Sequence, residues 1–171
     1  MRRRMFVLLG LGAALGLFAG SALATPVINA TAETARGPLV DRPLAVNWKF
    51  APGNRVKLQT KGPMEIAFQR IVLQPATPGQ PFPTLGWHSH PGPTVVTVRA
   101  GTLSFYHDEA CNTETEYATG QSFSNLPNEI HLARNEGAQE VVLFAVYFVP
   151  VSSPPLALRI DQPSPGPGCP Q

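Results

Sequence analysis

Three histidines lie in two short segments whose other residues are typical of β-strands. His88 and His90 belong to the segment GWHSHPGPTVVTVRAG, residues 86–101, and His131 belongs to GQSFSNLPNEIHLARN, residues 120–135. Side chains alternate between the two faces of a strand, so both imidazoles of a His-x-His pair lie on the same face. A third imidazole from another strand would complete a transition-metal site. The three histidines are therefore candidate metal ligands.

The rest of the chain alternates between strand-like runs and turn signals. β-branched and aromatic residues fill the runs, and no stretch keeps the apolar period of 3.6 residues that marks an amphipathic helix. Short strands at regular spacing are typical of an antiparallel barrel or sandwich. The expected strands cover residues 44–50, 64–74, 87–90, 94–99, 102–107, 113–118, 129–134 and 140–149.

The first histidine segment resembles a motif of the cupin superfamily, whose members are small β-barrels that usually hold a metal inside. In that motif two histidines at i and i+2 are followed by a glutamate and then by a turn glycine. His88, His90 and Gly101 match this pattern. Thr94 stands where the glutamate is expected, and Phe82 stands where the family has a leading glycine.

The second histidine segment resembles the second cupin motif. Gly120, His131 and Asn135 match it, and Asn128 replaces its turn glycine. Asparagine is among the few residues that tolerate the left-handed backbone of such a glycine. The resemblance covers residues 81–149 and implies an all-β, single-domain protein with a cupin jelly-roll barrel, also called a double-stranded β-helix. It also implies a metal on the three histidines.

The threonine at position 94 bears on the reaction. A glutamate would cancel part of the charge of a divalent ion, whereas three neutral imidazoles leave its full charge and open coordination positions. Such an ion favours a small anionic or enolisable substrate, and the site resembles that of three-histidine iron dioxygenases among the cupins. The expected cofactor is a divalent transition metal (Fe, Ni, Cu, Zn or Mn), because imidazole suits these ions better than Mg or Ca.

Several functions stay open for such a barrel. The first is a dioxygenase-like enzyme, or a related lyase or isomerase, for which no catalytic residue is assigned. The second is a non-catalytic module that binds a small molecule or a metal. The third is a structural or storage protein that has lost its chemistry, with Thr94 as the trace of that loss. In a metal-free barrel the imidazoles would only form hydrogen bonds.

Other residues near the motifs have simpler interpretations. Glu65 and Glu129 lie on strands next to the motifs, but a charged strand residue usually faces solvent. His107 ends a strand and is expected to be a solvated loop histidine. Trp87 points away from its neighbour His88 by alternation and is expected to pack on the outer sheet. Four aromatic residues are candidates to line the interior: Phe68, Phe105, Phe123 and Tyr147.

The N-terminal residues predict export to the periplasm or the medium. Residues 1–24 form a signal peptide, with three arginines, an apolar run and a small-x-small site that predicts cleavage after Ala24. The general secretory and the twin-arginine routes both fit this start. An uncleaved membrane anchor is the alternative, although the apolar run is shorter than the roughly 20 residues of a span. After cleavage we expect no stable membrane association.

The mature chain is expected to form one domain with two extended ends. Residues 25–43 are polar and punctuated by proline, which predicts an extended arm; residues 44–151 form the expected barrel, and residues 152–171 a Pro-rich tail. Cys111 and Cys169 are expected to form a disulfide that pins this tail, because exported proteins fold under oxidising conditions; two free thiols are the alternative.

Charge and composition restrict the partners. Signal cleavage removes three of the 13 basic residues and leaves 10 against 11 acidic residues. No basic cluster interleaved with aromatic residues remains, so nucleic acid is not an expected partner. A small-molecule ligand or substrate is expected. The N-terminal arm and the open sheet edges would also allow a homodimer.

Overall fold

The computed structural model describes residues 23–40, 43–50 and 52–171, so the predicted signal peptide lies outside the described residues up to position 22. Among the described residues, no helix is long and apolar enough to span a membrane. The regular elements are β1 (Ala30–Pro38), β2 (Ala45–Lys49), β3 (Arg55–Gln59), β4 (Met64–Leu73), β5 (Thr84–Ser89), β6 (Thr94–Ala100), β7 (Thr102–His107), the 3-10 turn η1 (Asp108–Ala110), β8 (Glu114–Ala118), β9 (Ser122–Asn125), β10 (His131–Arg134), β11 (Val141–Pro150) and β12 (Ile160–Asp161).

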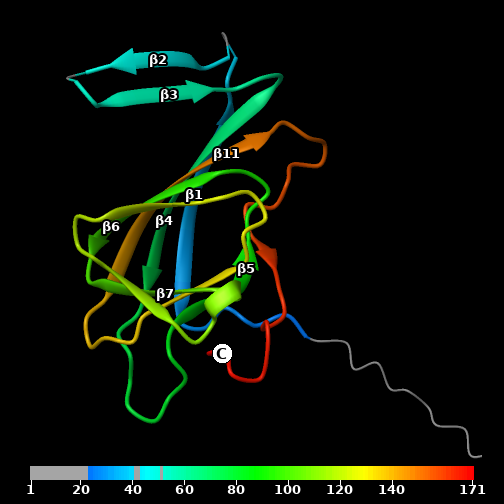
Figure 1. The fold of residues 1–171 in the computed structure, drawn as a ribbon. Helices are drawn as coiled ribbons and strands as arrows, with labels where there is room; N and C mark the ends of the chain where they lie inside the picture. Colours follow the sequence, from blue (N-terminus) through cyan, green and yellow to red (C-terminus); the bar gives the residue numbers. More distant parts are fainter. Residues whose placement is uncertain (1–22, 41–42, 51) are drawn as a thin grey trace, which may run out of the picture.

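Two five-stranded sheets form the barrel (Figure 1). One has the order β1-β4-β11-β6-β9 and the other has the order β12-β5-β10-β7-β8, with antiparallel pairing throughout. Strands that are distant in sequence are neighbours in both sheets, as in a jelly roll. The predicted all-β class with a jelly-roll barrel is therefore confirmed.

The core lies between the inner faces of the two sheets. Alternate residues of β11 are buried there, as the period of a strand requires, and residues of β6 and β7 meet them from both sides. The buried apolar residues of this cluster are Ala67, Ile71, Leu73, Val96, Val98, Leu103, Phe105, Ala133, Val141, Leu143, Ala145, Tyr147, Val149 and Leu158.

Two strands in the N-terminal part of the chain, β1 and β3, are not predicted by periodicity, whereas β2 matches the strand expected over residues 44–50. Residues 30–38 form β1, an edge strand paired along its whole length with β4. The next strands, β2 and β3, pair with each other as a hairpin that projects beyond the barrel (Figure 1). Small and polar residues make up β1 and all but Ala30 are exposed, so its sequence lacks the apolar alternation that identifies a half-buried strand.

The C-terminal tail covers the outer face of the second sheet. A disulfide links Cys111, next to η1, with Cys169 in the tail. Trp87 is fully buried in a cluster with Tyr106, Leu132 and Cys169, and its indole N–H donates a hydrogen bond to the Pro170 carbonyl. Trp87 thus packs on the outer side of the sheet, as predicted. The tail also adds β12 to the edge of β5.

Candidate metal centre

The three histidines of the two motifs converge inside the barrel. His131 on β10 pairs directly with His88 on β5, and His90 follows β5 by one residue. One ring nitrogen from each histidine lies within 4.8 Å of the other two. The three residues are 2%, 4% and 1% exposed in the order His88, His90, His131. The structure therefore brings together all three predicted residues in a buried cluster.

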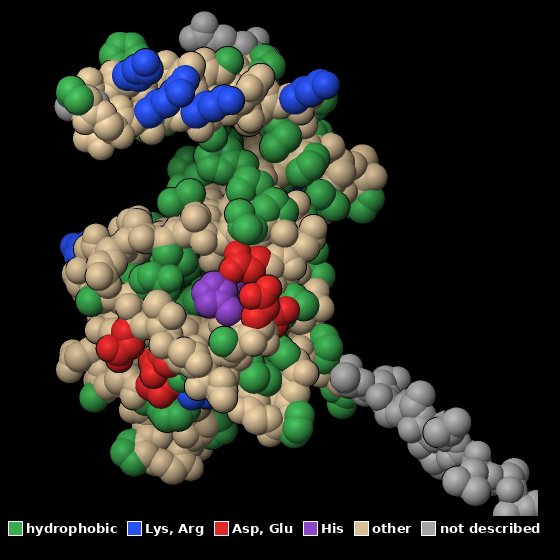
Figure 2. Space-filling model, viewed as in Figure 1, with side chains coloured by type: hydrophobic (Ala, Val, Ile, Leu, Met, Phe, Trp, Pro, Cys, Tyr) green, Lys and Arg blue, Asp and Glu red, His purple; other side chains and the backbone are tan. Residues whose placement is uncertain are grey.

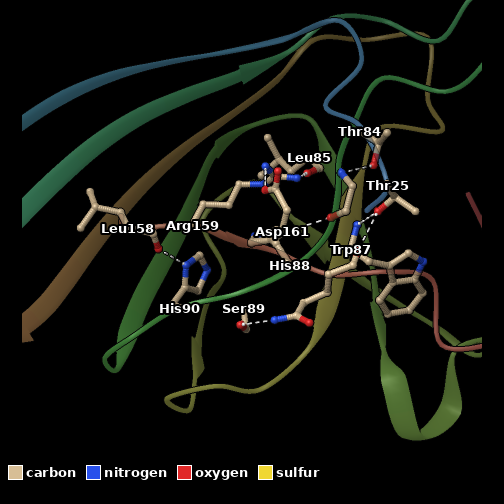
Figure 3. Close-up of polar contacts among 12 residues, drawn as sticks. Thr25, Thr84, Leu85, Trp87, His88, Ser89, His90, Leu158, Arg159 and Asp161 are labelled. Carbon is tan, nitrogen blue, oxygen red and sulfur yellow. Dashed lines mark hydrogen bonds and ion pairs between the residues drawn. The ribbon is translucent and has the colours of Figure 1, made fainter. Parts of the chain in front are cut away.

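Backbone carbonyls fix the orientation of each imidazole. The Nδ1 atoms of His88, His90 and His131 lie 2.8, 2.7 and 3.0 Å from carbonyl oxygens. The acceptors are the carbonyls of Gly86, Leu158 and Glu129; Figure 3 shows the bond between His90 and Leu158. A carbonyl oxygen only accepts, so Nδ1 must carry the proton of each neutral ring. The Nε2 atom of each ring keeps its lone pair for another partner.

A glycine next to the first motif shapes the strand that carries His88. Gly86 has φ of +69°, a backbone conformation that L side chains rarely adopt. A Cβ atom at this position would lie 2.5 Å from the carbonyl oxygen of Thr25. Only glycine fits between the N-terminal segment and β5, and its carbonyl then accepts the bond from His88 Nδ1.

The electrostatic environment keeps the cluster neutral. Burial removes the histidines from water and is the main reason why their pKa values are lowered. The pKa of His88 falls well below its usual value, that of His90 is also lowered, and that of His131 falls to about 3. Repulsion among the rings adds to the effect at His88 and His131, and the guanidinium of Arg159 adds to it at His88 and His90. At neutral pH the imidazoles are therefore unprotonated, as a metal requires.

The histidines face a small cavity of about 20 Å³. That volume holds an ion or a water molecule rather than an organic substrate. Apart from Asn125 and Tyr147, the remaining wall is apolar; the other lining residues are Ile71, Leu85, Val96, Leu103, Phe105, Phe123, Ala133 and Leu143. The Tyr147 hydroxyl donates to Gln69, and burial raises the pKa of Tyr147, so this phenol is not a base.

A larger pocket of about 520 Å³ lies on the surface beside this cavity. Residues 126–130 line the pocket and connect Asn125 to His131, which both line the inner cavity. The side chains of His107 and Glu129 also line the pocket, and His107 Nδ1 lies 2.8 Å from a carboxylate oxygen of Glu129. Figure 2 shows histidine and acidic side chains gathered on this face of the barrel. Residues 126–130 thus belong to the wall of the surface pocket and continue at both ends into residues that line the cavity.

The acidic candidates lie outside the cavity. Glu65 pairs with Arg36 on β1, and Glu129 lines the surface pocket, so neither contributes a carboxylate to the histidine cluster. His107 ends β7 and is partly exposed, in agreement with the prediction. Asn128 has φ of +61°, which confirms the left-handed backbone expected there.

The aromatic and threonine candidates divide between the interior and the outside of the barrel. Phe105, Phe123 and Tyr147 line the cavity, whereas Phe68 is 55% exposed on the outer face, so its predicted place in the interior is wrong. Apolar residues lie on both faces of β4, so its sequence does not show which face is the interior. Thr94 is fully buried, and its hydroxyl lies 3.4 Å from the Gly92 carbonyl.

Sequence reasoning missed three residues that shape the cluster. Asn125 lines the cavity, and the Leu158 carbonyl accepts a hydrogen bond from His90. Arg159 lowers the pKa values of His88 and His90. Leu158 and Arg159 come from the Pro-rich tail, where a backbone acceptor leaves no sequence signal. A polar residue within the second motif could have drawn attention to Asn125.

Comparisons with known proteins were made for the sequence and for the fold. No curated protein matches the sequence. A cupin-like protein from Thermotoga maritima is 17% identical, with a TM-score of 0.46 over 61% of this chain and 79% of that chain. The polyketide cyclase RemF from Streptomyces resistomycificus is 13% identical (TM-score 0.41, 48% and 54%), and an oxalate oxidase is 18% identical (TM-score 0.40, 54% and 52%). This chain thus spans about half the length of the last two proteins.

The family comparison covers both histidine segments. The family model described as cupin domain matches residues 71–147. These residues include β5 to β10, the strands that carry the histidine cluster, and the start of the pairing between β4 and β11. This match identifies residues 71–147 as a cupin domain.

Proposed function

We propose that this protein binds one divalent transition metal through Nε2 of His88, His90 and His131. The observation that carries the proposal is the fixed orientation of three neutral, buried imidazoles, in which each Nδ1–H donates a hydrogen bond to a backbone carbonyl. One ring nitrogen of each histidine lies within 4.8 Å of the other two, so the three rings can share one cation. Imidazole donors suit Fe, Ni, Cu, Zn or Mn.

A metal-free hydrogen-bonded cluster accounts for the same residues less well. Such a cluster needs donors that point to the Nε2 atoms, but each ring already uses its own N–H for a carbonyl. The amide of Asn125 is a donor on the cavity wall, and its Nδ2 lies 3.5 Å from Nε2 of His131. This distance is at the outer limit of a hydrogen bond.

The reaction we propose is dioxygenase-like chemistry, or a related lyase or isomerase step, on a small anionic or enolisable substrate. When bound, the metal would supply a Lewis acid and an oxygen-activating centre. The protein holds the ion with neutral ligands, so its full charge is available to attract an anion. The apolar wall excludes water and so strengthens that attraction.

The two spaces beside the histidines suggest a route for the substrate. The surface pocket of about 520 Å³ is large enough for a small organic molecule, whereas the inner cavity of about 20 Å³ is not. A substrate that enters the pocket would reach the metal after residues 126–130 move aside. These residues are held by bonds from the Asn128 N–H to the His90 carbonyl and from the Leu126 N–H to Glu129.

The small inner cavity also favours the second candidate function. A non-catalytic cupin that holds a metal ion alone needs no more space than the structure provides. In that case the protein would serve metal or small-molecule binding, and no substrate would be converted.

One experiment separates these possibilities. The full chain is expressed with export, its metal content is measured, and the iron-loaded protein is tested for oxygen uptake and product formation with diketones, thiols and phenolic acids. About one metal per chain with turnover supports the enzyme, and one metal without turnover supports the binding module. Metal that is absent from the wild type, or retained by His131→Ala, contradicts the proposal. His107→Ala, which alters a histidine outside the cluster, is the matched control.

We also propose export to an oxidising compartment. The disulfide between Cys111 and Cys169 supports this location, because such bonds persist in the periplasm and outside the cell. Equal amounts of oxidised protein in a cytosolic fraction would contradict it. A homodimer stays a prediction from the arm and the sheet edges.

A further inference from the structure

We infer that Asn125 supplies the oxygen donor that the first motif lacks at Thr94, and that it completes a site of three nitrogens and one oxygen. The inference rests on the proposed metal site. It adds a fourth residue to that site and assigns it to a different strand, β9 instead of β6.

The amide of Asn125 is buried and has an oxygen without a partner. The residue is 2% exposed and lines the histidine cavity. Its Oδ1 is inaccessible to solvent and forms no hydrogen bond among the described residues. Leaving a buried carbonyl oxygen unpaired is unfavourable, so such atoms usually mark a missing ligand, ion or water.

A second asparagine shows what a structural role looks like in this protein. Asn135, also fully buried, donates through Nδ2 to the carbonyls of Gln74 and Gln139 and accepts through Oδ1 from the Gly137 N–H. Both ends of that amide are used to tie two segments together. Asn125 lacks the acceptor half of this arrangement.

The position of Asn125 brings its amide to the histidines. The Nδ2 atom lies 3.5 Å from Nε2 of His131, the nitrogen that the proposed metal would use. Rotation about the Cβ–Cγ bond exchanges the oxygen and the nitrogen of an amide, and this torsion has broad minima. After that rotation the oxygen would take the place that Nδ2 now holds beside the ring.

Asn125 lies directly opposite Thr94, the position at which the family motif has a glutamate. Thr94 on β6 pairs directly with Asn125 on β9, and directly paired residues share one face of a sheet. The Thr94 side chain is shorter than glutamate, and its hydroxyl is directed to the Gly92 carbonyl. The neighbouring strand thus offers the oxygen that the motif position does not.

The replacement changes the charge of the site but not its donor type. An amide oxygen is neutral, so the ion keeps its full charge, in contrast to a site with a glutamate. An oxygen donor also suits Mn and Fe better than a purely imidazole set does. The site would therefore attract an anionic ligand more strongly than a family member with glutamate.

The test compares Asn125→Leu, Asn125→Asp and the control Thr94→Val, which removes the neighbouring hydroxyl. Affinity for Co(II) and its visible absorption band are measured by titration, and the melting temperature is measured on the metal-free proteins. We expect Asn125→Leu to bind Co(II) about 10- to 100-fold more weakly, with a shifted band, while Thr94→Val stays close to the wild type. The metal-free Leu variant should melt no lower than the wild type, because an unpaired buried oxygen is removed.

The opposite pattern overturns the inference. If Asn125→Leu binds Co(II) like the wild type and its metal-free form melts at a lower temperature, the residue is structural. If the Leu variant does not fold, Asn125→Asp decides, because a carboxylate in the coordination sphere should bind Co(II) more tightly and unchanged binding rejects the role. Failure of the proposed metal site itself is distinguishable, since the wild type and Thr94→Val would then bind no Co(II) either.

Discussion

The metal-free protein should lose stability as the pH falls below about 6.5, the usual pKa of histidine. Burial lowers the pKa of His131 to about 3 and also lowers the pKa values of His88 and His90. In the folded chain the rings stay neutral at pH values at which the unfolded chain protonates them. The unfolded state then binds more protons, so the free energy of unfolding decreases as the pH falls. This stability is complete above about pH 6.5 and is lost below it.

The magnitude follows from the pKa of His131 in the two states. A change from 6.5 in the unfolded chain to about 3 in the folded chain removes roughly 2 kcal/mol of unfolding free energy between about pH 7.5 and about pH 5. His88 and His90 act in the same direction. A loss of this size is a large part of the roughly 5–15 kcal/mol that stabilises a typical domain.

Urea unfolding of chelator-treated protein, followed by tryptophan fluorescence at both pH values, measures this loss. The variant His131→Gln keeps a neutral polar side chain without the titrating ring, so its loss should be smaller than that of the wild type by roughly 2 kcal/mol. His107→Gln serves as the control for an imidazole outside the cluster. Equal losses in the wild type and in His131→Gln would refute the reasoning, because the buried ring would then not be coupled to folding.

Three further predictions concern the disulfide, two turn glycines and the binding of the metal. Replacing both Cys111 and Cys169 by alanine should lower the unfolding free energy by about 4 kcal/mol, since the bridge spans 58 residues; unchanged urea midpoints would contradict this. Gly101→Ala should lower the melting temperature more than Gly120→Ala: both have positive φ, but a Cβ at Gly101 would lie 2.5 Å from the Glu140 carbonyl oxygen, and at Gly120 nothing lies within 4 Å. Equal melting temperatures would count against that difference. Metal at a hundred times its Kd should raise the unfolding free energy by about 2.7 kcal/mol, and a chelator should reverse the gain.

The sequence predicts the barrel well because its core strands obey simple periodicity. Buried and exposed residues alternate along β6, and β7 and β11 are rich in the β-branched and aromatic residues that are typical of strands. The strands β1, β3, β9 and β12 escape prediction for physical reasons. β1 and β3 are largely exposed, and β9 and β12 are short edge strands whose pairing depends on partners far away in the sequence.

The candidate site was predictable only in part. The imidazoles of His88, His90 and His131 could be placed together because the family resemblance supplies the long-range pairing of β5 and β10. The partners that orient them are backbone carbonyls, and that of Leu158 lies 68 residues from His90, so no side-chain pattern encodes them. The same holds for Asn125, whose role depends on an unpaired oxygen and not on spacing.

The most direct test of the metal site is anomalous diffraction from crystals of the protein purified with its native ion. We predict a single strong peak at the absorption edge of that metal, inside the barrel and about 2.0–2.2 Å from Nε2 of each of His88, His90 and His131. Absence of a peak from the cavity in crystals grown with Co(II) or Zn(II), or a peak on the protein surface alone, would contradict the account.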